Sequence, residues 1–176
     1  MSDKIWRSRG YIPHCDHAGY VQHIVFGLAD AVSGAPESDD TERRTAWWDA
    51  QFDRGAGACL LRGDAATIVE EALLHFDGER YRLLGWCVMP NHVHVLAEQF
   101  ASASLDRVVH GWKSWTANAI NRLHGRTGRL WRREYFDRYM RTDEQFWTTR
   151  RYIEMNPVAA GLCHAPHDWP WSSASR

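Results

Sequence analysis

Two strand-like runs separated by a three-residue turn constrain the fold of this chain most strongly. Residues 81–88 (YRLLGWCV) and 92–97 (HVHVLA) are rich in β-branched and aromatic residues, and residues 89–91 (MPN) between them suit a tight turn. Polar and apolar residues alternate in the second run, so the side chains of His92 and His94 lie on one face of the strand. The sequence therefore predicts an antiparallel hairpin that carries two imidazoles on one face.

The other predicted elements alternate between strands and helices. A first strand is expected over 20–28, and apolar residues at helical spacing predict a helix that Asp64 caps and a second long helix from Ser104. A short strand over 139–141 follows. The last helix is expected to start at a capping box, Thr142 to Gln145, and to end at Pro157.

This element order predicts the fold class. The order β-α-β-β-α-β plus a C-terminal helix is that of an α+β, ferredoxin-like sandwich with helices on one face of an antiparallel sheet. The uncovered face is where we expect a site. The length suits a single domain over 1–176, with residues 31–63 as an inserted loop that contains the polar stretch 33–41.

Charge is distributed unevenly along the chain. The formal net charge is −1, but residues 101–151 carry 11 basic and 5 acidic groups, and the chain has 19 Arg and only 2 Lys. Guanidinium groups bind phosphate through paired hydrogen bonds and stack on flat rings, so Arg together with 10 Trp favours a nucleic-acid partner, although buried Trp and a solvated Arg face would give the same composition. The residues of this basic region that are predicted to bind such a partner are Arg107, Lys113, Arg122, Arg126, Arg129, Arg132 and Arg133.

Composition also excludes several classes of protein. No apolar run is long enough to span a membrane, and the first ten residues lack the apolar core of a secretory signal. The four Cys are far apart and form no CxxC pair, which argues against a zinc ribbon or a disulfide framework. We expect a cytoplasmic protein.

The final helix supplies residues that could complete a site with the two imidazoles. Tyr152 and Asn156 are four residues apart and lie on one helix face. A phenol can attack phosphorus when a nearby divalent cation stabilises its charge, and the Asn156 amide could serve as a third, oxygen ligand beside His92 and His94. Two alternatives stay open at this point: an ordinary pair of satisfied histidines, and a core tyrosine followed by a helix-capping asparagine.

The chain resembles the REP-associated tyrosine transposases, a branch of the single-tyrosine transposases in the HUH (histidine-hydrophobe-histidine) endonuclease superfamily. The matching motifs are GYVQHIVFGLAD, LLGWCVMPNHVHVLAE, RLWRREYFDRYMR, RRYIEMNPVAAGL and WPWSS, which follow one another across about residues 10–173. One departure is Ala159, where the family often has a Lys after NPV.

The resemblance implies both a site and a reaction. His92 and His94 would bind Mg²⁺ or Mn²⁺, with Asn156 at the position of a third polar ligand, and Tyr152 would be the nucleophile. The expected substrate is single-stranded DNA with short hairpins of repetitive palindromes, cleaved through a 5′-phosphotyrosine intermediate. Whether the chain acts as a monomer or a homodimer stays open.

Other interpretations compete with this one. Tyr135 and Tyr139 are alternative nucleophiles, but neither has an Asn four residues later. A hairpin-binding protein without activity would keep the same fold. The cluster His14-Cys15-Asp16-His17 has metal-ligand residue types, although its spacing is too short for all four to hold one ion.

Overall fold

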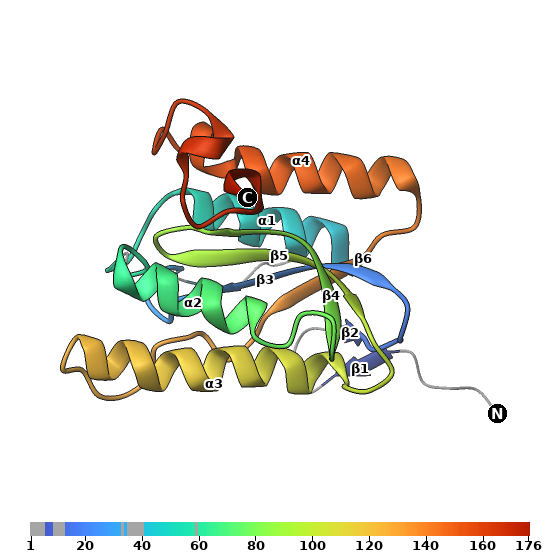
Figure 1. Ribbon diagram of the computed structural model, residues 1–176, viewed down its shortest axis with the longest axis horizontal. Helices are drawn as coiled ribbons and strands as arrows, with labels where there is room; N and C mark the ends of the chain where they lie inside the picture. The colour runs from blue at the N-terminus through green and yellow to red at the C-terminus, as the bar shows by residue number, and fades with distance from the viewer. Residues whose placement is uncertain (1–5, 9–12, 33, 35–40, 59) are drawn as a thin grey trace.

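One four-stranded antiparallel sheet organises the chain (Figure 1). The computed structural model describes residues 6–8, 13–32, 34, 41–58 and 60–176. The sheet consists of β3 (Val21–Gly27), β4 (Tyr81–Val88), β5 (His92–Gln99) and β6 (Phe136–Tyr139), in the order β4-β5-β3-β6. The first and third of these strands in chain order are central and the second and fourth are at the edges. This arrangement confirms the predicted α+β class and the predicted hairpin.

Two helices cover one face of the sheet. α2 (Asp64–Leu74) and α3 (Leu105–Leu123) pack side by side there, and α3 buries the apolar stripe predicted from its sequence. The indole of Trp112 stacks near Phe26 of β3 at 6.3 Å and donates a hydrogen bond to the Tyr81 hydroxyl at 2.9 Å. The alternating apolar residues of the hairpin thus form the main core with these two helices.

The opposite face, expected to be uncovered, is also packed against helices. α4 (Asp143–Ala159) crosses β4 and β5, and α1 (Thr41–Asp53) lies on the same side of the sheet (Figure 1). Segment 31–63 is therefore not simply a loop, because α1 lies within it. Trp48 and Phe52, four residues apart, form the buried side of α1. The Trp48 ring packs on the Phe136 ring with centroids 4.8 Å apart. Residues 33 and 35–40 of the expected polar stretch lie outside the described residues.

Three predicted boundaries differ from the structure. Gly63, rather than Asp64, is the N-cap of α2. β6 ends at Tyr139, where the strand was expected to begin. α4 continues through Pro157 to Ala159: a proline removes one N–H of the helix, and this one is buried and close to the C-terminal end, so the lost hydrogen bond does not stop the helix.

Short elements complete the fold. β1 (Trp6–Ser8) pairs with β2 (Pro13–Cys15), and two 3₁₀ turns, η1 (Pro166–Asp168) and η2 (Ser173–Ser175), lie near the C-terminus. The C-terminal segment covers the exposed edge of β4, where the Val88 N–H donates to the Trp171 carbonyl at 2.9 Å. In the described part of the chain, no helix combines the length and apolar character needed to cross a membrane.

Candidate active site

The imidazoles of His92 and His94 lie together under α4. β5 projects both toward that helix because they alternate along the strand, and their Nε2 atoms are 2.9 Å apart. His92 is 1% exposed and His94 0%. Two ring nitrogens therefore face one another on one face of the strand, as the alternation predicted, but that face is buried under a helix and not uncovered as expected.

α4 brings the two remaining predicted residues to the same place. The Asn156 side-chain amide lies 3.3 Å from Nε2 of His94, and the ring of Tyr152 meets the His94 ring edge-on with centroids 5.5 Å apart. Asn156 is buried and Tyr152 is half-buried. The four predicted residues thus converge from a strand and a helix that are about 60 residues apart in the sequence.

A third imidazole, which the sequence did not single out, lies behind His94. His23 of β3 is buried, and its Nε2 is 3.1 Å from Nδ1 of His94. The Tyr152 ring also meets the His23 ring edge-on at 6.2 Å. Arg138 is paired with His23 across β3 and β6, and its guanidinium lies 3.5 Å from the Thr149 hydroxyl of α4.

His92 has its own buried partners. Its Nδ1 lies 2.7 Å from Oδ1 of Asn91, and the Asn91 amide nitrogen donates to the carbonyls of Phe52 and Ala56 at 3.0 and 3.2 Å. The Phe52 ring stacks on the His92 ring at 5.1 Å. The C-terminal end of α1 is therefore part of the wall of the site.

Burial favours the neutral form of these imidazoles. Loss of solvation lowers the pKa of His94 to about 3. Burial first, and then the neighbouring His94, lower the pKa of His23 and His92 well below the usual range. Neutral imidazoles keep the lone pair that a metal ion requires.

Two neutral imidazole nitrogens and the side chain of Asn156 are the groups at this site that could hold a divalent cation. The two Nε2 atoms, 2.9 Å apart, are close enough for both to bind one ion. Among the described residues, no group of three His, Cys, Asp or Glu could hold a metal ion. His23 is on the far, Nδ1 side of His94, and the Asn156 atom that lies 3.3 Å from Nε2 of His94 is the amide nitrogen. The Asn156 amide would therefore have to turn its oxygen toward an ion to serve as the third ligand.

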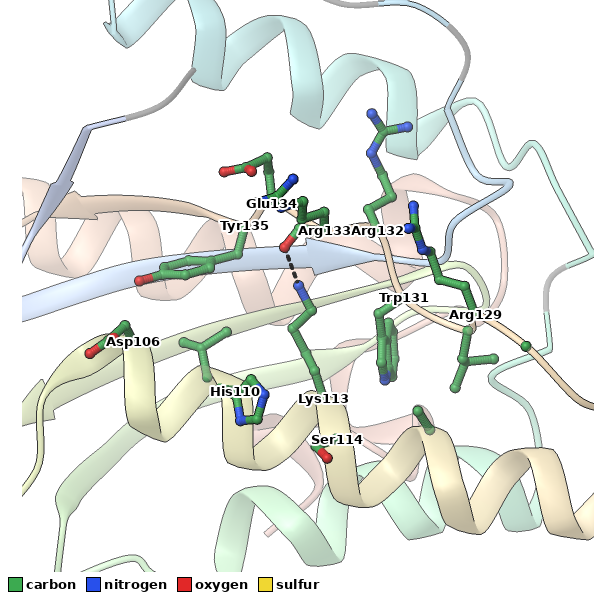
Figure 2. Close-up of a pocket in the computed structure, with 14 residues that line it drawn as sticks. Asp106, His110, Lys113, Ser114, Arg129, Trp131, Arg132, Arg133, Glu134 and Tyr135 are labelled. Carbon is green, nitrogen blue, oxygen red and sulfur yellow. Dashed lines mark hydrogen bonds between the residues drawn. The ribbon is translucent and has the colours of Figure 1, made fainter. Parts of the chain in front are cut away.

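The predicted DNA-binding residues only partly form one surface. A groove of about 500 Å³ runs between α3 and residues 128–135, and Figure 2 shows its lining. Of the seven predicted residues, the four that line the groove are Lys113, Arg129, Arg132 and Arg133. The other three, which are exposed but do not line it, are Arg107, Arg122 and Arg126.

Two of the lining cations also have structural contacts. Lys113 donates to the Arg133 carbonyl at 2.9 Å, and burial lowers its pKa to about 8, against the opposing charge of Glu134. Arg132 points toward α1 in Figure 2, where it donates to the Val32 carbonyl at 2.7 Å and lies over the Trp48 ring. The groove is therefore positively charged, and its residue Arg132 also packs on Trp48 of α1.

The alternative nucleophiles are not at the imidazole pair. Tyr135 is buried and lines the groove beside α3. Tyr139 pairs with Gln22 in the sheet, so it lies on the face opposite that of His23, and it stacks on Tyr20 at 5.4 Å.

The N-terminal cluster has structural contacts where it is described. The carboxylate of Asp16 accepts from the Gln99 side chain at 2.8 Å and from the Leu105 N–H at the start of α3 at 3.2 Å. Cys15 is buried, and desolvation raises its pKa to about 11. The side chain of His14 lies outside the described residues.

The chain matches a family of transposases. The family model described as "Transposase IS200 like" matches residues 61–156, and the chain belongs to this family. The match includes both imidazoles, the tyrosine and the asparagine. It supports the resemblance recognised from the sequence motifs.

Individual proteins agree with the family. A protein of Haemophilus influenzae curated as a "Putative REP-associated tyrosine transposase" is 26% identical over 100 residues, which cover 51% of this chain and 57% of the relative. The match thus spans less than two thirds of the relative. A solved structure of a REP-associated tyrosine transposase bound to a REP hairpin shares the fold with a TM-score of 0.61 at 17% identity, covering 100% of this chain and 84% of that chain.

Sequence reasoning missed two residues that contact the imidazole pair. Asn91 was interpreted as a turn former, because Asn is common in turns whatever its side chain contacts. His23 is a polar residue that points toward the site from a strand whose only other polar residue is Gln22, and that irregularity was the available signal. The location of α1, and therefore of Phe52, had no comparable signal.

Proposed function

We propose that the chain is a metal-dependent single-stranded DNA endonuclease and strand transferase that acts on hairpins of repetitive palindromic DNA. The observation that carries this proposal is the convergence of Tyr152 and Asn156 of α4 on the buried imidazoles of His92 and His94. The fold shared with a transposase solved on a REP hairpin supports the substrate class.

In this proposal, His92, His94 and Asn156 hold Mg²⁺ or Mn²⁺. When bound, the cation would stabilise negative charge on the phosphate oxygens and on the attacking phenolate. The protein's part is to supply two neutral imidazole nitrogens and the buried side-chain amide of Asn156, whose oxygen would turn toward the cation.

Tyr152 is the proposed nucleophile. Its phenolic oxygen attacks phosphorus in line, the bond from phosphorus to the 3′ oxygen breaks, and that oxygen leaves as a 3′-hydroxyl. One proton leaves the phenol and one reaches the 3′ oxygen, so the step is proton-neutral. The 5′-phosphotyrosine keeps the energy of the broken bond, and attack by another 3′-hydroxyl can complete strand transfer.

The tyrosine and the imidazoles that it meets belong to the same chain. The ring of Tyr152 packs against His94 and His23 without a second subunit. This placement supports attack within one chain. A homodimer is not required for the proposed site to be complete.

The basic groove is the proposed DNA-binding surface. Lys113, Arg129 and Arg133 line it beside Trp131 and Tyr135. Guanidinium and ammonium groups would neutralise backbone phosphates, while base edges or stacking would give sequence preference.

A covalent-adduct assay tests the proposed nucleophile. The protein is incubated with Mn²⁺ and an oligonucleotide that carries a hairpin and an unpaired flank, and the products are separated on a denaturing gel. We expect Tyr152→Phe to reduce the adduct below detection, roughly 10³-fold or more, because the attacking oxygen is absent. His92→Ala should also abolish it, whereas Tyr139→Phe, on the other face of the sheet, should retain it.

The same assay separates the proposed enzyme from a hairpin-binding protein without activity. The inactive protein would shift the hairpin in a native gel and form no adduct with any divalent cation. An undiminished adduct in Tyr152→Phe would show that another residue is the nucleophile.

A further inference from the structure

The side chain of Asn91 has a fixed orientation. Its amide nitrogen has two carbonyl acceptors, those of Phe52 and Ala56, and only an N–H can satisfy them. The amide oxygen must therefore face Nδ1 of His92, which lies 2.7 Å away. Since that oxygen is only an acceptor, Nδ1 of His92 carries the hydrogen and Nε2 carries the lone pair.

The acceptors for Asn91 come from the C-terminal end of α1 and the turn after it. Carbonyl groups at the end of a helix lack partners within the helix. The Phe52 carbonyl accepts from the Gly55 N–H at 3.0 Å, and its second lone pair is available to Asn91. The Phe52 ring covers the His92 ring from the same direction. α1 therefore fixes the plane of the His92 ring and, through Asn91, its tautomer.

A corresponding constraint acts on His94. Nε2 of His94 faces His92 and Asn156, while Nδ1 faces Nε2 of His23 at 3.1 Å. For Nε2 of His94 to bind a cation, the hydrogen must be on Nδ1, where His23 is the acceptor within reach. His23 is buried, so water does not readily replace it there.

We propose that Asn91 and His23 are positioning residues that direct the Nε2 lone pairs of His92 and His94 toward a shared cation. The inference rests on the proposed function, because it concerns the same cation, and it assigns to α1 a part in building the site. Hydrogen bonds of this kind usually change metal affinity by about 10- to 100-fold.

The protons have a definite arrangement before a cation binds. With the lone pair of His92 Nε2 directed at His94, the contact of 2.9 Å places a hydrogen on Nε2 of His94, and His23 then donates from its Nε2 to Nδ1 of His94. The Asn156 amide nitrogen, 3.3 Å from Nε2 of His94, cannot donate to that nitrogen in this state, so the amide has to turn its oxygen toward His94. Cation binding requires His94 to carry its hydrogen on Nδ1, so His23 must move its own to Nδ1. His92 keeps its Nδ1 hydrogen in both states.

NMR of protein labelled with ¹⁵N in histidine tests this arrangement without any assay of activity. Long-range proton–nitrogen spectra distinguish the two neutral tautomers of each ring. On addition of Mg²⁺, we expect His94 and His23 to change from Nε2–H to Nδ1–H while His92 remains Nδ1–H, and exposed His110 to be unaffected. A His92 ring that carries its hydrogen on Nε2 would overturn the proposal.

Metal affinity gives the second test, with Mn²⁺ titrated into each variant and free Mn²⁺ measured by electron paramagnetic resonance. We expect Asn91→Ala and His23→Phe to weaken binding by about 10- to 100-fold, and His23→Gln, whose amide oxygen can accept from His94, to stay within a few-fold of wild type. Thermal unfolding of each variant checks that it is folded.

The outcomes separate this inference from the proposed function. Unchanged Mn²⁺ binding in His92→Ala would overturn the cation site itself. If His92→Ala loses binding while Asn91→Ala and His23→Phe bind like wild type, the site stands and the positioning role is wrong.

Discussion

Gly27 allows an aromatic ring to approach the imidazole pair. A Cβ atom built at Gly27 would lie 2.1 Å from Cε1 of Phe52, closer than any real contact. Gly27 pairs with His92 across β3 and β5, so the absent side chain leaves the space in which the Phe52 ring covers His92. A single glycine thus determines how closely α1 packs on the site.

We predict that Gly27→Ala destabilises the fold by about 1–3 kcal/mol, because the added methyl group displaces the Phe52 ring. In a Phe52→Ala background, the same change should cost clearly less, since the space is empty. Denaturant unfolding of the four proteins of this cycle measures the difference. Gly111→Ala in α3 is the control: no neighbouring atom outside the helix backbone lies within 4 Å of a Cβ built there. This change should be neutral or should stabilise the fold by roughly 0.5–1 kcal/mol. Equal costs in the two backgrounds would contradict this explanation.

The sequence predicted correctly which candidate residues lie together where two of them are close within one strand or one helix. His92 and His94 were paired by strand alternation, and Tyr152 and Asn156 by helical spacing. Asn91 and His23 were missed because their partners, a carbonyl of α1 and an imidazole of another strand, become neighbours only through tertiary packing.

α4 carries half of the proposed site, and its first turn is capped as the sequence predicted. The Thr142 hydroxyl accepts from the Gln145 N–H at 3.2 Å. The Gln145 side chain reaches back one residue further than a standard capping box, to the Arg141 N–H at 2.9 Å. Both contacts fix the direction in which α4 starts across the sheet.

We predict that Thr142→Ala lowers the free energy of unfolding by about 0.5–2 kcal/mol, because one N–H of the first helical turn loses its acceptor. Thr148→Ala, an exposed position of the same helix, serves as the control and should change it by at most about 0.5 kcal/mol. Chemical denaturation gives both values. A Thr142→Ala protein as stable as wild type would show that the cap contributes nothing.

Elements with long periodic patterns were predicted well, and those without them were not. The hairpin and α3 have apolar patterns that leave few alternatives. α1 buries only a narrow edge, which includes Trp48 and Phe52, among polar neighbours, so its segment was expected to be a loop. Pro157 was expected to end α4, but tertiary packing near the helix end outweighed its local effect.

At the scale of the whole molecule, the uneven distribution of charge along the sequence produces a basic groove in which burial lowers the pKa of one lysine. The pKa of Lys113 is lowered to about 8 by burial, so its ammonium group is present at pH 7 and is lost as the pH rises through 8. The arginines that line the same groove keep their charge over this range.

We predict that affinity for a hairpin oligonucleotide falls between pH 7 and pH 9, and that the slope of log affinity against log salt decreases by roughly 0.9, the value for one phosphate contact. Lys113→Arg should bind equally well at both pH values, because its guanidinium stays charged. Fluorescence anisotropy at several salt concentrations measures both quantities. The same pH dependence in Lys113→Arg would assign it to another group.

The helix that borders the groove and the helix that carries Tyr152 lie on opposite sides of the sheet (Figure 1). The segment that includes the groove arginines meets the end of β3, where the Arg132 N–H donates to the Gly27 carbonyl at 2.9 Å. A nucleic acid bound in the groove would therefore have to bend around the sheet at the end of β3 before its backbone could reach the hydroxyl group of Tyr152. A flexible unpaired strand bends in this way more readily than a rigid duplex. When the unpaired flank of the oligonucleotide is shortened step by step, cleavage should be lost while the protein still binds the hairpin stem. The distance from the groove to Tyr152, rather than recognition of the hairpin, would then set the minimum length of a substrate.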